Sequence, residues 1–314
     1  MAQTATIHVK LPYTNSEDWT DFTSEKVELA GFQWFLNGLF YIRTGNIQME
    51  SAQIHCAPIG GKKTSIWNCE ASGKIMALAS NSDKQCFKPW SHSFDIHHLS
   101  TEPVDENFRK LFPPGATFVF EDAGEKFCQL EVQVNVMRYK LIDLSDSKNE
   151  MIQSPDDAAE VDVEGEKLWL SKAFLGMHSP FFKTLFNSDF KEKLTGQYNL
   201  EDVKLDQFLH CLCLLSGVHM DIDGKAIKYL MRLGDYFQCD LIISHCRHLL
   251  FASKIPVEKK IEWVDRLGLH STTRELLKTM DSAALKRIVN SGALLELSAV
   301  MNREIMTRMT ELLK

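Results

Sequence analysis

The chain has 314 residues, of which 44% are hydrophobic, and its formal net charge is −7. This length suits about two domains with buried cores, and an acidic balance without basic clusters argues against nucleic acid as the main partner. No apolar run follows Met1 or approaches the roughly 18 residues of a membrane span, so we expect a cytoplasmic or nuclear protein that is neither secreted nor inserted in a membrane.

Residues 1–140 alternate between apolar and polar side chains with a period of two. Near the start, Ile7, Val9 and Leu11 share one face. Near the end, the apolar positions of the same alternation are Leu130, Val132, Val134 and Val136. Turn signals such as Gly60-Gly61 and Ser72-Gly73 separate these runs. Many short strands with this punctuation predict an all-β antiparallel sandwich.

Residues 141–156 have the polar and acidic composition of a linker. From Asp143 to Glu166 there are nine acidic residues against a single lysine, which gives a local charge of −8 and leaves the rest of the chain near +1. We expect this charge to keep the segment solvated.

After the linker, a strand pattern changes to a helical one. Leu168 and Leu170 share a strand face, and Ala173, Phe174 and Met177 then lie on one side of a short helix. The change from period two to helical spacing predicts a strand followed directly by a helix.

Ser179-Pro180 starts a second helix, because serine caps free backbone N–H groups and proline fits the first helical position. Phe182, Leu185 and Phe186 follow at helical spacing and form a stripe that we expect to be buried. Three more helices are predicted over 206–215, 225–238 and 240–251. Helices clustered on a small sheet indicate the α+β class.

Residues 251–314 are predicted to form four amphipathic helices. Pro256 opens the first, and Thr272 with Glu275 three positions later makes a capping box for the second. Asp281 and Ser298 open the other two.

The Ser-Pro-Phe-Phe sequence at 179–182 is followed by Leu215-Ser216-Gly217 and by Leu233-Gly234-Asp235-Tyr236. With the preceding order of strand, turn, strand and helix, this pattern closely resembles the BTB (POZ) fold over residues 157–250. Ser171 and Leu215 stand where that family usually has histidine and tyrosine. The resemblance implies a domain that forms homodimers.

Four features of residues 1–140 carry a second resemblance: Gly31-Phe32-Gln33-Trp34, Trp67 in a strand before Ser72-Gly73, Trp90 followed by Phe94, and a last strand over 127–137. They are similar to the MATH domain, the substrate-binding sandwich also found in TRAF proteins.

The MATH resemblance implies an extended peptide held in a groove across one sheet face. By position, the groove candidates are Trp67, Phe87, Trp90 and His92. For Trp67 and Trp90 the alternative is an ordinary core position, since aromatic residues usually serve cores. Ser91-His92 replaces the usual Gly-Phe, so the peptide specificity of the family is not carried over.

A MATH domain followed by a BTB domain is the arrangement of cullin-3 adaptors. In these, a hydrophobic-x-Glu motif lies in the loop after the Ser-Pro helix, and Phe190-Lys191-Glu192 has that position here. A partner would cover the exposed apolar side chain of Phe190, and Glu192 would accept hydrogen bonds from it. The alternative is that Phe190 packs into its own domain while Glu192 is solvated.

Residues 251–314 resemble the BACK-like or 3-box-like helical extension that follows BTB domains in cullin-3 adaptors. The resemblance implies that residues 256–280 widen the contact with the cullin. A helical cap that merely covers the BTB domain is the alternative.

The chain lacks the sequence motifs of phosphate-binding loops, zinc proteases and serine hydrolases. Cys239, His245, Cys246 and His248 lie close in sequence, but one helix face cannot gather all four around a metal. Buried free thiols in a reducing compartment explain the eight cysteines. We therefore expect no metal, no cofactor and no enzyme active site.

These patterns lead to one main hypothesis. The chain is a dimeric substrate-recognition adaptor of a cullin-3 RING ubiquitin ligase, which binds target peptides through its MATH-like domain. Its BTB domain would bind cullin-3 and a second copy of the chain. The alternative is a dimeric BTB scaffold or regulatory protein that does not bind a cullin.

Overall fold

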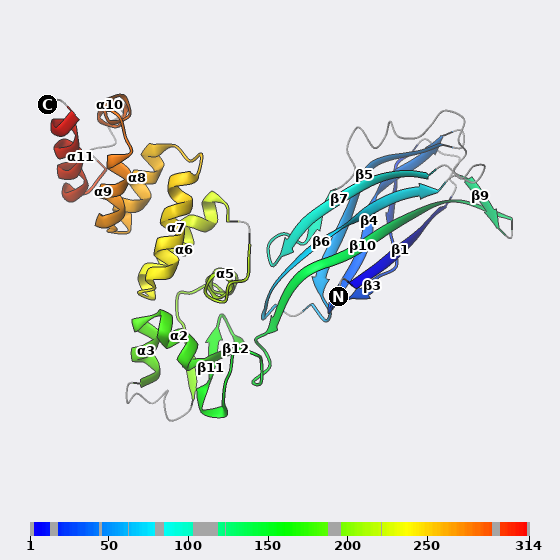
Figure 1. Cartoon of the computed structure of the whole chain (residues 1–314), viewed down its shortest axis with the longest axis horizontal. Coiled ribbons are helices and arrows are strands. Elements are labelled where there is room, and N and C mark those ends of the chain that lie inside the picture. The colour runs from blue at the N-terminus through cyan, green and yellow to red at the C-terminus, as the bar shows by residue number, and fades with distance from the viewer. Residues whose placement is uncertain are drawn as a thin grey trace. The chain divides into compact units, whose positions relative to one another are not determined.

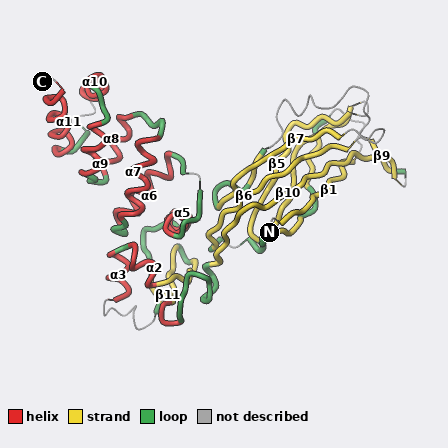
Figure 2. The backbone as a smooth tube through the Cα atoms, in the orientation of Figure 1, coloured by secondary structure: helices red, strands yellow, loops and turns green. Residues whose placement is uncertain are grey.

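This computed structural model describes residues 3–12, 18–43, 46–61, 63–78, 85–102, 119–122, 124–187, 196–220, 222–290 and 296–312. The chain divides into two compact units, and the main break lies between Leu144 and Ser145. Figure 1 and Figure 2 show strands in the first unit and mostly helices in the second. The predicted order of an all-β segment, an α+β segment and C-terminal helices is confirmed.

Two antiparallel sheets build the first unit. The strands of one sheet are β1 (Gln3–Pro12), β6 (Ser65–Leu78), β7 (Gln85–Asp95), β9 (Val119–Asp122) and β10 (Glu125–Asp143). The strands of the other are β2 (Thr20–Thr23), β3 (Val27–Leu29), β4 (Phe32–Arg43), β5 (Asn46–Pro58) and β8 (Ser100–Thr101). The first sheet has the order β1-β10-β6-β7, with β9 also paired to β10. The second has the order β2-β4-β5-β8, with β3 also paired to β4.

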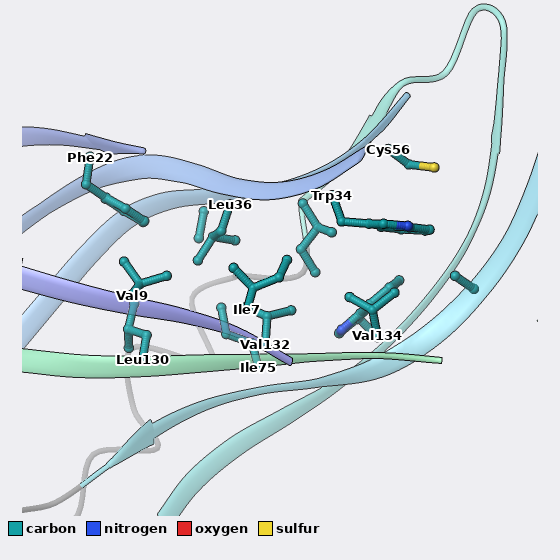
Figure 3. Close-up of a cluster of buried hydrophobic side chains, with 14 of the residues drawn as sticks. Ile7, Val9, Phe22, Trp34, Leu36, Cys56, Ile75, Leu130, Val132 and Val134 are labelled. Atoms are coloured by element: carbon teal, nitrogen blue, oxygen red, sulfur yellow. The ribbon is translucent and has the colours of Figure 1, made fainter. Parts of the chain in front are cut away.

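The core of this unit lies between the two sheets. Ile7 and Val9 of β1 and Leu130 and Val132 of β10 are buried, as the alternation predicts. Figure 3 shows these side chains facing Leu36 of the second sheet. Each sheet therefore turns one face inward and leaves the other open to partners.

Gly73 corrects one turn prediction. The residue lies in the middle of β6, paired with Val134 on one side and with Trp90 on the other. A Cβ atom added there would lie 1.8 Å from the Gln133 carbonyl oxygen and 3.0 Å from Nε1 of Trp90. The glycine therefore allows a close approach inside a strand rather than a change of chain direction.

The second unit begins with a three-stranded sheet, in which a central strand pairs antiparallel with one neighbour and parallel with the other. These strands are β12 (Glu166–Ser171), the central β11 (Ala158–Val163) and β13 (Gln197–Asn199). The helices that follow up to residue 252 are α2 (Lys172–His178), α3 (Pro180–Asn187), α5 (Leu205–Leu215), α6 (Gly224–Tyr236) and α7 (Asp240–Ala252). The predicted helices are thus confirmed to within one or two residues.

Phenylalanine rings form the centre of this α+β region. The ring centroid of Phe182 lies 4.8 Å from that of Phe237, 5.8 Å from that of Phe186 and 6.2 Å from that of Phe208. Ser179 fixes the start of α3, since its hydroxyl donates to the Phe237 carbonyl and accepts from the Phe182 N–H at 3.2 Å. The predicted cap is confirmed, and the predicted buried stripe is confirmed at Phe182 and Phe186, whereas Leu185 is half-buried.

The acidic segment after residue 144 is folded against the second unit rather than solvated along its length. The Asn149 side chain is buried and donates to the carbonyl of Trp169 at 2.9 Å. Asp157 ends a short 3-10 helix (Pro155–Asp157) and accepts from the Ala173 N–H at 2.8 Å. The strand β10 also extends to Asp143, into the predicted linker.

Four helices complete the chain: α8 (Val257–Arg266), α9 (His270–Lys278), α10 (Ser282–Asn290) and α11 (Ala299–Leu312). Asp281 and Ser298 accept from backbone N–H groups of α10 and α11, as predicted caps should. The capping box at Thr272 is wrong, because α9 begins two residues earlier and Thr272 is buried. Glu275 instead lies 3.6 Å from Nε of Arg247.

Within the described ranges, no helix is both long and apolar enough to cross a bilayer.

Candidate functional site

The outward face of the sheet β1-β10-β6-β7 presents an exposed aromatic side chain. Phe87 of β7 is 49% exposed and pairs with Met76 of β6. The ammonium group of Lys74 lies 4.9 Å from the Phe87 ring centroid. An apolar ring beside a cation can hold an apolar side chain and a carboxylate of a peptide. Phe87 is the predicted groove residue whose side chain a ligand on this face can contact.

The other three predicted groove residues face the interior. In the register of the sheet, Trp67 pairs with Leu141, and Trp90 and His92 pair with residues of β6 that turn inward. Trp67 and Trp90 are only 3% and 7% exposed and belong to the core cluster. The His92 ring lies 4.7 Å from the core ring of Phe94. The predicted set is therefore divided between two faces, and its role in peptide binding stays a prediction.

Polar pairs also lie on the outward face, along β1, β10 and β6. Arg138 of β10 contacts Glu70 of β6 with a shortest N–O distance of 2.8 Å, and Nδ1 of His8 lies 3.2 Å from Glu131. These side chains can exchange their partners for the polar groups of an extended peptide. Sequence reasoning missed these pairs, although the alternation assigns His8 and Glu131 to the face opposite the core. Arg138 reaches this face only because a register shift follows Val136.

A buried carboxylate closes the far end of β7. Asp95 is 1% exposed, and its Oδ1 accepts from the N–H groups of His97 at 2.8 Å and of His98 at 2.9 Å. Burial opposes ionisation of this carboxyl, but the two backbone bonds and the nearby His98 ring outweigh it and lower its pKa below the ordinary value. Asp95 thus fixes the loop between β7 and β8. Because the ionised carboxylate holds this loop, the stability of the loop depends on pH.

The predicted cullin motif, Phe190 with Glu192, lies outside the described residues. The chain around it is described up to Asn187, where α3 ends, and again from Gly196, just before β13. The role of Phe190 and Glu192 therefore stays a prediction from sequence.

Two apolar residues that the sequence did not single out as site residues are exposed where α6 meets α7. Tyr236 is 47% exposed and its ring lies 5.4 Å from that of Phe181, while Leu241 is 49% exposed. Exposed apolar side chains on a packed support are typical of protein-binding surfaces. Tyr236 was visible in the sequence only as a family landmark, without a sign that it points to solvent.

The four residues considered for a metal site are not oriented alike. Cys239 and Cys246 are buried, whereas His245 and His248 are exposed. Burial raises the pKa of the Cys246 thiol to about 12, so the thiol is neutral near neutral pH. Across the described ranges, no three residues of the metal-binding types form a cluster.

Together, the two sheets of the first unit and the small sheet with its helices define a β-sandwich joined to an α+β protein-interaction domain. The model of the BTB/POZ domain matches residues 157–254. Two relatives from Caenorhabditis elegans match most of the chain, both at 23% identity. BTB and MATH domain-containing protein 38 is matched over 78% of this chain and 63% of its own length, and BTB and MATH domain-containing protein 36 over 84% and 81%.

Residues 157–254 thus match the BTB/POZ domain, and most of the chain is similar to proteins that contain both BTB and MATH domains. These matches agree with both resemblances seen in the sequence. The chain spans less than two thirds of the length of the first of these relatives.

Proposed function

We propose that the protein is a substrate adaptor of a cullin-3 ubiquitin ligase. The observation that carries the proposal is the presence, in one chain, of a sandwich with an open outward face and of a BTB domain followed by helices. Such an adaptor carries out no chemical step itself. It raises the effective concentration of a target near the transfer site by holding both at once.

The exposed residues at the junction of α6 and α7 support a protein contact on the BTB domain. Tyr236 rests on Phe181 of α3, the helix that leads into the segment with Phe190 and Glu192. A partner covering Tyr236 and Leu241 would bury two large apolar side chains, which is favourable at about 25 cal/mol per Å² of apolar surface.

The surface of α2 supports the proposed homodimer. Met177 is 72% exposed and lines a cavity of about 370 Å³ with Phe186 of α3. A symmetric contact over this surface would cover the exposed Met177 in each copy. Two copies would then present two substrate-binding sandwiches, which increases the avidity for targets with repeated motifs.

Binding of the purified chain to the N-terminal region of cullin-3, measured by calorimetry, tests the proposal. The double variant Phe190→Ala with Glu192→Ala should weaken binding by tenfold or more, since it removes both the apolar anchor and its acceptor. The matched control is Phe87→Ala, which removes an exposed aromatic side chain from the sandwich and should leave cullin binding unchanged.

Two outcomes would contradict the proposal. Cullin binding that survives the double variant would remove the motif from the explanation. A stable homodimer that does not bind the cullin at all would favour the scaffold alternative.

A further inference from the structure

A cavity of about 400 Å³ lies between α5, α6 and α8 in the second unit. Its size is within the range of sites that take a small ligand or the side chains of a peptide. Gln207 comes from α5, Tyr229 from α6, and Trp263 from α8. The site therefore exists only where the BTB helices and the C-terminal helices pack together.

A buried lysine fixes the wall that α8 contributes. Lys260 donates to the carbonyl oxygens of Ser253 at 2.9 Å and Phe251 at 3.3 Å, at the end of α7. These bonds occupy orphan carbonyls of a helix end, and burial lowers the pKa of this lysine. Trp263 lies one turn further along α8, so the bonds that anchor this helix through Lys260 also fix the position of Trp263.

Positive charge gathers around the opening, against the acidic balance of the whole chain. The cationic residues that line the cavity are Lys204, Lys225, Lys228, Arg232 and Arg266. Arg266 is paired with Glu262 at 2.7 Å, and Arg232 donates to Gln207 at 3.1 Å. Within the described part of the chain, Lys225 and Lys228 have no carboxylate oxygen within 4.0 Å. Like charges held together without partners lower stability, so such a cluster favours an external anion.

The base of the cavity is apolar. Trp263 and Leu267 are half-buried and line it together with the half-buried ring of Tyr229. The Tyr229 hydroxyl is hydrogen-bonded to Nδ1 of His210, which holds the ring in place. The ammonium group of Lys228 lies 6.0 Å from the Trp263 ring centroid. The lining therefore has an apolar floor and a cationic rim.

We propose that this cavity is a second peptide-binding site, which takes an apolar side chain flanked by carboxylates from an acidic segment of a partner protein. The floor of Trp263, Tyr229 and Leu267 accepts the apolar side chain, and Lys225, Lys228 and Arg232 bind the flanking carboxylates.

A peptide fits better than a small phosphate compound. The lysines are exposed on long stems, and in the described part of the chain no hydrogen bond or ion pair fixes Lys225 or Lys228, although the Lys228 ammonium lies 6.0 Å from the Trp263 ring centroid. This arrangement suits a mobile rim around an apolar anchor more than a rigid phosphate cradle.

The floor residues Trp263 and Leu267 lie within residues 256–280, which the sequence predicts to widen the cullin contact. Lys225 and Lys228 lie outside both this range and the segment with Phe190, so a variant of these two lysines should bind the cullin N-terminal region as the wild type does. Loss of peptide binding with cullin binding retained is thus separable from failure of the adaptor function.

Fluorescence anisotropy with labelled pentapeptides tests the site. The probe is Asp-Asp-Phe-Asp-Asp, and the matched peptides replace the centre by Ala or all four flanking residues by Asn. We expect the Phe-centred acidic peptide to bind about tenfold more tightly than either matched peptide, because each of those lacks one half of the recognition. Binding should weaken as salt is added.

The protein variant is Lys225→Glu with Lys228→Glu, which should reduce the affinity for the acidic peptide by tenfold or more. The control is Lys254→Glu with Lys259→Glu, two exposed lysines outside the cavity that change the net charge equally. Thermal unfolding of both variants checks that they are folded, and the milder Lys225→Gln with Lys228→Gln is used if the reversal unfolds the chain.

Three results would overturn the proposal. One is no binding of the Phe-centred acidic peptide up to millimolar concentration. Another is an equal loss of affinity in the control variant, which would indicate attraction by net charge alone. The third is that inorganic tripolyphosphate displaces the peptide and binds more tightly than the peptide does. That result would assign the cavity to small phosphate compounds.

Discussion

The core of the first unit lies between two sheets of long strands, whereas the core of the α+β region gathers around four phenylalanine rings. In the sandwich, apolar contacts are spread along ladders such as those of β10 with β1 and β6. In the α+β region, Phe182 contacts the rings of Phe186, Phe208 and Phe237 at once. A spread core tolerates the loss of one side chain better than a core with one central ring.

The largest expected effect is that of Phe182→Ala, which removes this central ring. We expect a loss of about 3–5 kcal/mol in the free energy of unfolding of the second unit. Calorimetric unfolding should show the lower stability in one transition, with the transition of the sandwich unchanged.

The control for that comparison is Ile7→Val in the sandwich, which should cost only about 0.5–1.5 kcal/mol and affect the other transition. If both substitutions shifted a single common transition, the two cores would not unfold independently and the contrast between them would be lost.

Asp95→Ala should give the next largest effect, in the sandwich. The variant removes the acceptor of two backbone N–H groups, and bonds to a charged acceptor contribute about 1.5–3 kcal/mol. Because the pKa of the folded-state carboxyl is lowered, its stabilisation is present above about pH 4 and is lost as the pH falls through the lower folded-state pKa. Denaturant unfolding at neutral pH and at about pH 3 measures both quantities.

The difference between wild type and Asp95→Ala should therefore shrink in acid. Asp122→Ala, which removes an exposed carboxylate of β9, is the control and should show no such difference at either pH. A gap between wild type and Asp95→Ala that stays constant down to about pH 3 would contradict the assigned role of the charge.

In the second unit, Ser179→Ala should cost about 0.5–2 kcal/mol of the free energy of unfolding, because the start of α3 loses its cap. Ser298→Ala is the matched variant, since Ser298 caps α11 from an exposed position. We expect the buried cap to be worth more than the exposed one, because water can replace the second but not the first. Equal losses in the two denaturation curves would show that burial of Ser179 adds nothing.

The sequence was informative wherever one local rule decided the structure. Alternation identified the inner faces of β1 and β10, and the Ser-Pro pair identified the start of α3. It failed at Gly73, because a glycine inside a strand and a glycine in a turn look the same without the partner strand. Thr272 failed for a similar reason, since the tertiary packing that buries it overrides the capping pattern.

For the candidate site, the sequence could name residue types but not their faces. Phe87 is an odd step from Trp90 and His92 along β7, so alternation alone could have separated it from them. That β7 lies next to β6, with Phe87 opposite Met76, depends on pairing between segments distant in sequence. The cavity between α5, α6 and α8 could not be predicted at all, because it depends on how three helices pack.

The smallest effect is expected on the outward face of the sandwich. Arg138→Ala breaks an ion pair with Glu70 whose Arg138 side chain is largely exposed, and such pairs contribute about 0–1 kcal/mol. A double-mutant cycle with Glu70→Ala should give a coupling energy in this range that falls at high salt. If the coupling were much larger, the outward face would be stabilised by its own polar pairs, and a peptide would have to break them to bind. A small coupling leaves both charges free to exchange partners, as peptide binding on this outward face requires.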